Sequence, residues 1–342
     1  MHYKKTIVGR LEKCYALAPL SVGGSKLMLV AAEKHDACLL LDLDGKIVER
    51  VMDEPGGVMT MVAVPGRESA FYTTHCSYSP NDSAEARLDY VRKTGEGWLV
   101  STVAELPFLH RFDLISAGPT TYILACTLKS EHEYKDDWRS PGKLWTGVLG
   151  PDPAAPLELA EFCGDLGHNH GYTRFEERGT ISGIVSCDEG VFRIFPPPAP
   201  GEAWRKDRLL QEPCSDAVML DLDGDGLPEL FTISPFHGDA LSIWHLEDGL
   251  YRRVYEHPEK LPFLHAICGG MVYGRPCVFV GCRGGDRQLL AFFWSDCEGW
   301  SCEELDRNAG AANCMLFERN GHPALLTTNR EINEIAVYDI LP

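Results

Sequence analysis

Residues 264–282 have the sequence LHAICGGMVYGRPCVFVGC, which is two short apolar segments around a tight turn. Residues 109–127, LHRFDLISAGPTTYILACT, repeat this pattern, and the pentapeptide LPFLH occurs at both Leu106–His110 and Leu261–His265. Five further copies of the pattern begin at Cys14, Val58, Asn169, Ser215 and Ala312. A pattern that recurs at roughly 40 to 55 residues indicates an array of similar structural units.

Each pair of segments is followed by a third strand-like segment, such as ACLLLDL, GVFRIFP, ALSIWHL, QLLAFFW or EIAVYDI, and then usually by a more polar fourth. No stretch keeps a 3.6-residue period for three turns, so long helices are not expected. These observations predict an all-β fold, a seven-bladed β-propeller of four-stranded antiparallel blades. The alternative, a pair of two-sheet β-sandwiches, explains the seven-fold recurrence poorly.

The repeat boundaries predict a single propeller domain over residues 1–342. The last unit ends after its third strand, whereas residues 5–12, KTIVGRLE, precede the first unit and have no blade of their own. We therefore expect the N-terminal strand to close the last blade and to remove an exposed sheet edge. The expected blades span approximately residues 14–55, 56–105, 106–162, 163–211, 212–257, 258–306, and 307–342 together with 5–12.

The composition indicates which partners and which cellular compartment to expect. The formal net charge of −18 argues against nucleic acid or an anionic membrane as a partner, because both attract basic surfaces. The N-terminus lacks the apolar core of a signal peptide, and no apolar run is long enough to span a membrane, so we expect a cytoplasmic protein. Several of the 13 cysteines, such as Cys126, Cys187, Cys277 and Cys282, lie in apolar segments, and we interpret them as reduced core residues. The sequence does not indicate the oligomeric state.

The fifth unit contains an acidic loop, Asp221-Leu-Asp223-Gly-Asp225-Gly-Leu-Pro-Glu229. Carboxylates at alternate positions around glycines can surround one hard cation, which favours calcium. The loop is not an EF-hand, because Thr232 occupies the position of that motif's bidentate glutamate. It resembles the DxDGDGxxD loop of FG-GAP and VCBS repeats, with Glu229 in place of the usual final Asp. The resemblance implies a structural calcium site; an unoccupied turn and a catalytic metal are the alternatives.

Histidines recur at corresponding positions in the repeat. In a propeller blade the first strand starts and the second strand ends on the same face, so residues at these positions should meet around one end of the axis. His110, His170 and His265 begin first strands, whereas His35, His75 and His237 follow second strands, as do the cations Lys129, Arg283 and Arg330. Converging imidazoles can hold Zn, Mn or Fe, and we predict an axial metal site formed by His110, His170 and His265. The alternative is that each of these rings binds no metal and forms its hydrogen bonds with backbone groups or water in the channel.

Two long loops are expected on the same face, over Cys76–Arg87 and Lys129–Lys143. Long loops at the mouth of a ring commonly act as lids. The first contributes Tyr78, and the second contributes His132, Tyr134 and Trp138. An aromatic ring beside acids and bases suits stacking on a sugar, so His35, Lys129, Trp138 and His237 are candidate substrate-binding residues.

The architecture and the acidic loop resemble the propeller lyases that cleave ulvan, rhamnogalacturonan and oligogalacturonate, and also aldos-2-ulose dehydratase. This resemblance implies a lyase, dehydratase or isomerase that acts on a small carbohydrate or oligosaccharide. A metal, or Arg283 and Arg330, would stabilise an enolate, with His75, His170 or Tyr78 as the base and His132 or Tyr134 as the acid. The alternative function is a non-catalytic module that binds a sugar or a peptide, because fold alone does not separate the two.

Overall fold

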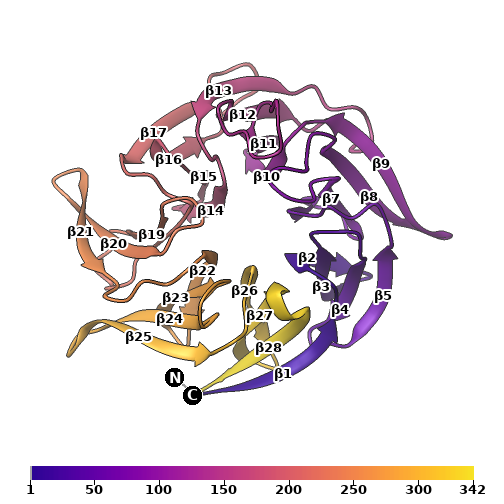
Figure 1. The fold of residues 1–342 in the computed structure, drawn as a ribbon. Helices are drawn as coiled ribbons and strands as arrows, with labels where there is room; N and C mark the ends of the chain where they lie inside the picture. The colour runs from indigo at the N-terminus through magenta and orange to yellow at the C-terminus, as the bar shows by residue number, and fades with distance from the viewer. Residues whose placement is uncertain (1) are drawn as a thin grey trace.

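The computed structural model describes residues 2–342 and shows seven four-stranded antiparallel sheets arranged in a ring (Figure 1). Every blade has its four strands in neighbouring order, so the first strand is innermost and the fourth is outermost. The structure is therefore the seven-bladed propeller that the repeats predict.

Blade one consists of β2 (Cys14–Val22), β3 (Ser25–Ala32), β4 (Cys38–Asp42) and β5 (Ile47–Met52), blade two of β6 (Met61–Ala63), β7 (Ala70–His75), β8 (Arg87–Thr94) and β9 (Gly97–Glu105), and blade three of β10 (Leu109–Ala117), β11 (Thr120–Lys129), β12 (Pro141–Val148) and β13 (Ala160–Leu166). Blade four consists of β14 (Gly171–Glu177), β15 (Thr180–Cys187), β16 (Gly190–Phe195) and β17 (Arg205–Leu210), and blade five of β18 (Asp216–Leu220), β19 (Glu229–Ser234), β20 (Ala240–Glu247) and β21 (Leu250–Glu256). Blade six consists of β22 (Leu264–Val272), β23 (Arg275–Cys282), β24 (Leu289–Ser295) and β25 (Gly299–Asp306), and blade seven of β26 (Asn313–Arg319), β27 (His322–Asn329), β28 (Glu334–Leu341) and β1 (His2–Arg10). A single-turn 3-10 helix, η1 (Arg330–Ile332), separates β27 from β28.

The N-terminal strand closes the ring. β1 pairs antiparallel with β28 from His2 opposite Leu341 to Arg10 opposite Glu334, and the two termini lie side by side in Figure 1. The pairing covers residues 2–10, whereas the sequence predicts 5–12. The shift arises because Leu11 leaves the ladder and is buried between the first and last blades.

The hydrophobic core is divided among the contacts between blades. Each of seven buried clusters contains residues from two neighbouring blades, as Tyr15 and Phe71 do between blades one and two. Burial of apolar area at every blade contact makes the ring rigid, and a rigid ring suits a site that combines residues from several blades.

A small ion-pair network fastens the closing strand. Lys5 Nζ lies 2.8 Å from Asp306 Oδ2 and 2.7 Å from Glu334 Oε1, and the hydroxyl of Tyr338 donates to Asp306 at 2.6 Å. Burial opposes the charged form of Asp306, but the hydrogen bonds from Lys5 and Tyr338 outweigh it and lower the pKa of this carboxyl group. The network therefore links β1, β28 and the sixth blade.

Replacing Asp306 by Asn is expected to lower the free energy of unfolding by about 1 kcal/mol at neutral pH. The folded-state pKa of Asp306 is the lower one, so its contribution is complete above the unfolded-state value of about 3.9 and disappears as the pH falls through the folded-state value. Urea unfolding of both proteins at pH 7, 4.5 and 3 measures this. An equal difference in stability at all three pH values would contradict the role given to Asp306.

The topology separates two faces of the ring. The ends of second strands and the starts of first strands lie on one face, and the turns that join first to second strands lie on the other. Within residues 2–342, no helix is long and apolar enough to cross a membrane.

Candidate active site

Four histidines from four blades meet around the axis on the first face. His110 lies on β10 and His265 on β22, His170 directly precedes β14, and His237 follows β19. Ring centroids are 4.7 Å apart for His110 and His170, 4.8 Å for His170 and His237, and 5.2 Å for His170 and His265. The repeat positions thus bring these side chains together, as expected from the sequence.

Three of these rings form a compact donor group. His170, His237 and His265 each offer one ring nitrogen, and these atoms lie within 4.8 Å of one another. The Nε2 atoms of His170 and His237 are 3.3 Å apart. The group differs from the predicted set in one member, because His237 takes the place assigned to His110.

The Nδ1 atoms of His170 and His265 form hydrogen bonds with residues outside the three-histidine group. Nδ1 of His170 lies 2.8 Å from Asp216 Oδ2, and Nδ1 of His265 lies 2.7 Å from the carbonyl oxygen of Ala312. Such partners fix the tautomer with the proton on Nδ1 and leave the Nε2 lone pair facing inward, which is the usual arrangement around metal-binding histidines.

His110 is buried beside the group without a hydrogen-bond partner. Its side chain is 1% exposed, and neither ring nitrogen has a partner among the described residues. A buried polar group without a partner is unfavourable and calls for an explanation such as an ion, water or catalytic role. The ring contacts His170 and is therefore within the same pocket.

The environment keeps the imidazoles of His110, His237 and His265 neutral. Burial lowers the pKa of His110 and His265 well below the ordinary value, with positive neighbours adding to the effect. Burial, followed by the charges of His170 and Arg283, lowers the pKa of His237 to about 2. Neutral rings at physiological pH can bind a metal or accept a proton.

Arginines provide positive charge near the histidines. Arg283 lies over the ring of Phe263, 4.5 Å from its centroid, and both Arg283 and Arg111 oppose protonation of His265, lowering its pKa. The guanidinium of Arg283 is held by Glu331, with Nε and Nη2 at 2.9 Å and 2.8 Å from Oε1. Arg330 forms ion pairs with Glu331 and with the buried Glu33, so it helps to hold the Glu331 carboxylate that binds Arg283.

An aromatic stack connects the lid with the histidine group. Trp138 lies 4.5 Å from His168, His168 lies 4.5 Å from Phe236, and Phe236 stacks on His237 at 4.0 Å between centroids. Trp138 belongs to the loop between β11 and β12, the lid expected from the sequence. The stack therefore links the loop between β11 and β12 to His237 through His168 and Phe236.

Lys129 anchors the loop between β11 and β12. Its side chain is 0% exposed, its Nζ donates to Asn81 Oδ1 at 2.7 Å and to the carbonyl of Asp137 at 2.9 Å, and it lies 4.4 Å from the ring centroid of Trp138. Burial lowers the pKa of Lys129. Because these contacts occupy the ammonium group, its contact with a substrate stays a prediction.

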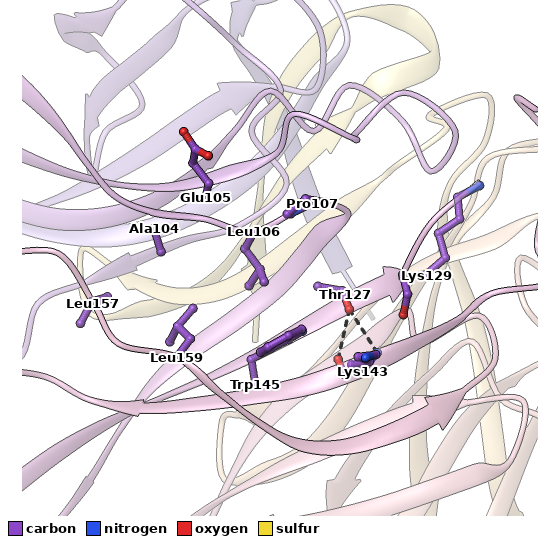
Figure 2. Close-up of a pocket in the computed structure, with 11 residues that line it drawn as sticks. Ala104, Glu105, Leu106, Pro107, Thr127, Lys129, Lys143, Trp145, Leu157 and Leu159 are labelled. Atoms are coloured by element: carbon purple, nitrogen blue, oxygen red, sulfur yellow. Dashed lines mark hydrogen bonds between the residues drawn. The ribbon is translucent and has the colours of Figure 1, made fainter. Parts of the chain in front are cut away.

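A groove of about 410 Å³ runs between blades two and three at the base of this loop (Figure 2). Its floor is apolar, with Trp145, Leu157 and Leu159, and Lys129 points away from that floor. The groove lies outside the histidine group, and none of the four axial histidines lines it.

The remaining predicted catalytic residues are distributed over the rim. His75 is buried and its Nδ1 lies 2.6 Å from Asp89 Oδ2, in a separate pair within blade two. Tyr78 contacts His35 at 4.3 Å between ring centroids, and burial raises the pKa of Tyr78 to about 12.

The two candidate acids of the lid differ in exposure. His132 packs edge-on against Phe108, whereas Tyr134 is 58% exposed. No direct contact between either side chain and the axial histidines is observed in the described part of the chain, and their catalytic roles stay predictions.

The acidic loop of blade five lies on the opposite face, between β18 and β19. Asp223, Asp225, Glu229 and His245 offer donor atoms within 4.8 Å of one another. Asp221 instead accepts hydrogen bonds from the amides of Gly224 and Gly226, at 2.8 Å and 3.0 Å, and thereby shapes the turn. The donor group therefore contains an imidazole that the sequence interpretation did not include.

Several residues of the site were missed from the sequence, namely Tyr15, Arg111, His168, Asp216, Phe236 and Phe263. One signal was available for Phe263, because both copies of LPFLH place a phenylalanine two residues before an axial histidine. Phe108 lies 5.6 Å from Lys129 Nζ in one blade, as Phe263 lies 4.5 Å from Arg283 in another. Each copy of LPFLH thus supplies an axial histidine and a phenylalanine, and a cation at or directly after the end of the blade's second strand lies over the phenylalanine ring.

No family model matches the chain, and no curated protein is similar to it in sequence. Solved structures of other propellers are similar in fold. They include streptogramin B lyase (12% identity, TM-score 0.60, 99% of this chain and 98% of that chain) and a putative 6-phosphogluconolactonase from Bacteroides uniformis (12% identity, TM-score 0.57, 96% and 93%). The Cps50 (Swd1) propeller domain of Myceliophteria thermophila is also similar (8% identity, TM-score 0.64, 99% and 100%). Identities this low show the shared propeller fold alone.

Proposed function

We propose that this protein is a metal-dependent enzyme of the lyase, dehydratase or isomerase type that acts on a sugar or uronate derivative in the axial pocket. The observation that carries the proposal is the group of three inward-facing imidazole nitrogens from His170, His237 and His265. Propellers of similar fold include proteins named as a lyase and as a putative lactonase, so this fold can carry catalysis.

The donor set fits a divalent transition metal such as Zn, Mn or Fe. Neutral imidazoles suit these ions, and the outer contacts of His170 with Asp216 and of His265 with Ala312 would orient two of the ligands. Tyr15 now donates from its hydroxyl to Nε2 of His265 at 3.2 Å, so this hydroxyl would become free when the nitrogen binds a metal. A bound metal would act as a Lewis acid on a carbonyl or carboxylate oxygen of the substrate.

The residues around this group supply the other requirements of a reaction at a carbon beside a carboxylate. His110 is neutral, unpartnered among the described residues and 4.7 Å from His170 between ring centroids, so it is the proposed base that removes the α-proton. Arg283 and Arg111 provide positive charge for an anionic substrate and for the developing enolate. The hydroxyl of Tyr15 is a candidate proton donor.

The proposed lid has a defined role in this account. Trp138 covers the stack that ends at His237, and the lid is anchored through Lys129. Opening would admit the substrate, and closing would exclude water from the pocket. A tryptophan ring at the mouth also suits stacking on a sugar.

Conversion of candidate substrates tests the proposed function. The protein, loaded with Zn²⁺ or Mn²⁺, is incubated with uronate-containing oligosaccharides, and the ultraviolet absorbance of unsaturated products and the masses of products are followed. New products that disappear on metal removal support the proposal. Tight binding with an unchanged ligand would instead support the non-catalytic module.

Asp216→Asn is expected to weaken binding of the axial metal by about 10- to 100-fold. The substitution removes a carboxylate that orients the His170 ring and makes the Nε2 atom of that ring more basic. Competition with a chromogenic chelator measures the affinity. Asp239→Asn, at an exposed carboxylate that pairs with Lys260, is the control. An unchanged affinity in Asp216→Asn would contradict the assigned role of His170 as a ligand.

We also propose calcium as a structural ion in the blade-five loop, with Asp223, Asp225 and Glu229 as ligands and Asp221 shaping the turn. The carboxylates suit a hard cation. Glu229 is fully buried and its oxygens accept hydrogen bonds from the amide of Leu222 and from His245, so calcium would replace at least the second of these contacts.

A further inference from the structure

Two cysteines from neighbouring blades lie in direct contact. Cys268 is on β22 and Cys314 is on β26, the innermost strands of blades six and seven. Their Sγ atoms are 3.2 Å apart, with the thiol of Cys314 donating to the sulfur of Cys268. Both residues are partly exposed, unlike the buried core cysteines Cys126 and Cys282.

Small residues allow the two strands to approach at this point. Gly269 and Gly270 follow Cys268, and a Cβ atom at Gly270 would lie 2.7 Å from the side chain of Leu316 on β26. Since β22 and β26 belong to different sheets, no backbone ladder joins them. A covalent bond between the two sulfurs would therefore join the innermost strands of blades six and seven, whereas contacts such as the Arg283–Glu331 ion pair link these blades outside those strands.

We propose that Cys268 and Cys314 form an oxidation site, in which a hydroperoxide converts the two thiols into a disulfide that joins blades six and seven. A disulfide requires the sulfurs to be about 2.05 Å apart, so each has to move by little more than half an ångström from its observed place. The proposal is independent of the proposed reaction at the axial pocket.

The chemistry assigns different roles to the two thiols. The thiol of Cys314 donates its hydrogen to the sulfur of Cys268, and this hydrogen bond raises the pKa of Cys314. The thiolate of Cys268 attacks the peroxide, forming a sulfenic acid and releasing water or an alcohol. The sulfur of Cys314 then attacks that sulfenic acid, the S–S bond forms and water leaves. Two electrons pass from the thiols to the peroxide.

The position of the pair links it to the histidine group. Cys268 is three residues after His265 on β22, and Cys314 is two residues after Ala312, whose carbonyl accepts the Nδ1 proton of His265. A disulfide would fix the two strands relative to each other beside that hydrogen bond. Oxidation is therefore expected to stiffen the support of His265.

Mild hydrogen peroxide treatment of the purified full-length protein tests the site. The expected product is lighter by about 2 Da, has eleven titratable thiols in place of thirteen after denaturation, contains a Cys268–Cys314 peptide pair, and returns to thirteen thiols with dithiothreitol. Its thermal unfolding midpoint should rise by a few degrees, because the bond closes a loop between residues 46 apart in sequence.

Single variants keep the test decisive. In Cys314→Ser and in Cys268→Ser the disulfide cannot form, so a sulfenic acid should be trapped by dimedone on the cysteine that remains. Cys297→Ser, at an exposed cysteine in the turn after β24, is the control and should oxidise like the parent. Thirteen titratable thiols after treatment, or adducts confined to Cys297, would overturn the proposal.

Discussion

His110→Gln is expected to lower kcat by about 10²- to 10⁴-fold while the protein retains its axial metal. Glutamine keeps hydrogen-bonding groups in the pocket but cannot take up a proton, and loss of a positioned base has effects of this size. The imidazole of His110 is the one axial ring without a hydrogen-bond partner among the described residues, so its removal leaves the other three rings in place. Steady-state kinetics on a substrate identified by the conversion assay measure the loss.

A metal measurement and a control variant make this result specific. His322→Gln changes an exposed histidine on the opposite face and should leave kcat unchanged. If His110→Gln lost both the metal and turnover, His110 would be a ligand, as the sequence interpretation proposed. Normal turnover in His110→Gln would exclude it from both roles.

Deleting residues 2–10 is expected to prevent folding into a stable monomer. The deletion removes β1, exposes the edge of β28 over Glu334–Leu341, and abolishes the strand pairing by which the N-terminus closes the ring. The truncated chain keeps the residues that pack between blades one and seven, such as Leu11, Met28 and Leu326, but loses the strand that ties the last blade to the first. Size-exclusion chromatography and circular dichroism of the truncated chain would report aggregation or unfolding.

Lys5→Ala is the matched control for the deletion. It removes the ion pairs with Asp306 and Glu334 but keeps the backbone ladder between β1 and β28. Its effect should be about 1 kcal/mol. A truncated chain that remained monomeric, with the thermal stability of Lys5→Ala, would show that ring closure contributes little.

The fold could be predicted because propeller repeats leave a clear sequence pattern. Two apolar strands around a turn recur seven times, the last unit lacks its fourth strand, and an unpaired strand-like segment precedes the first unit. The ends of β1 do not follow from the sequence, because alternation within KKTIVGRLE is compatible with more than one register. Contacts from elsewhere decide the register, such as burial of Leu11 and the pairing of Lys5 with Asp306.

The histidine group could be predicted in part. Position within the repeat placed His110, His170, His237 and His265 on one face, since strand direction determines the face. Which three of them converge depends on ring orientations set by Asp216 and by the carbonyl of Ala312, and a carbonyl leaves no signal in the sequence.

The contacts of the loop between β11 and β12 could not be predicted from the sequence. The sequence indicated a long loop with Trp138, but not that the ring of Trp138 would stack through His168 and Phe236 onto His237. These contacts join residues from blades three, four and five, and no local pattern specifies them. The same holds for the partnership between Cys268 and Cys314.

Metal analysis of freshly purified, untagged protein tests the central claim most directly. We expect about one equivalent of Zn, Mn or Fe that is lost in His170→Ala, His237→Ala and His265→Ala, each still folded by circular dichroism, together with calcium that is lost in Asp223→Asn instead. Transition metal that stays bound in all three histidine variants, or none bound by wild-type protein even after incubation with Zn²⁺ and Mn²⁺, would contradict an axial metal centre.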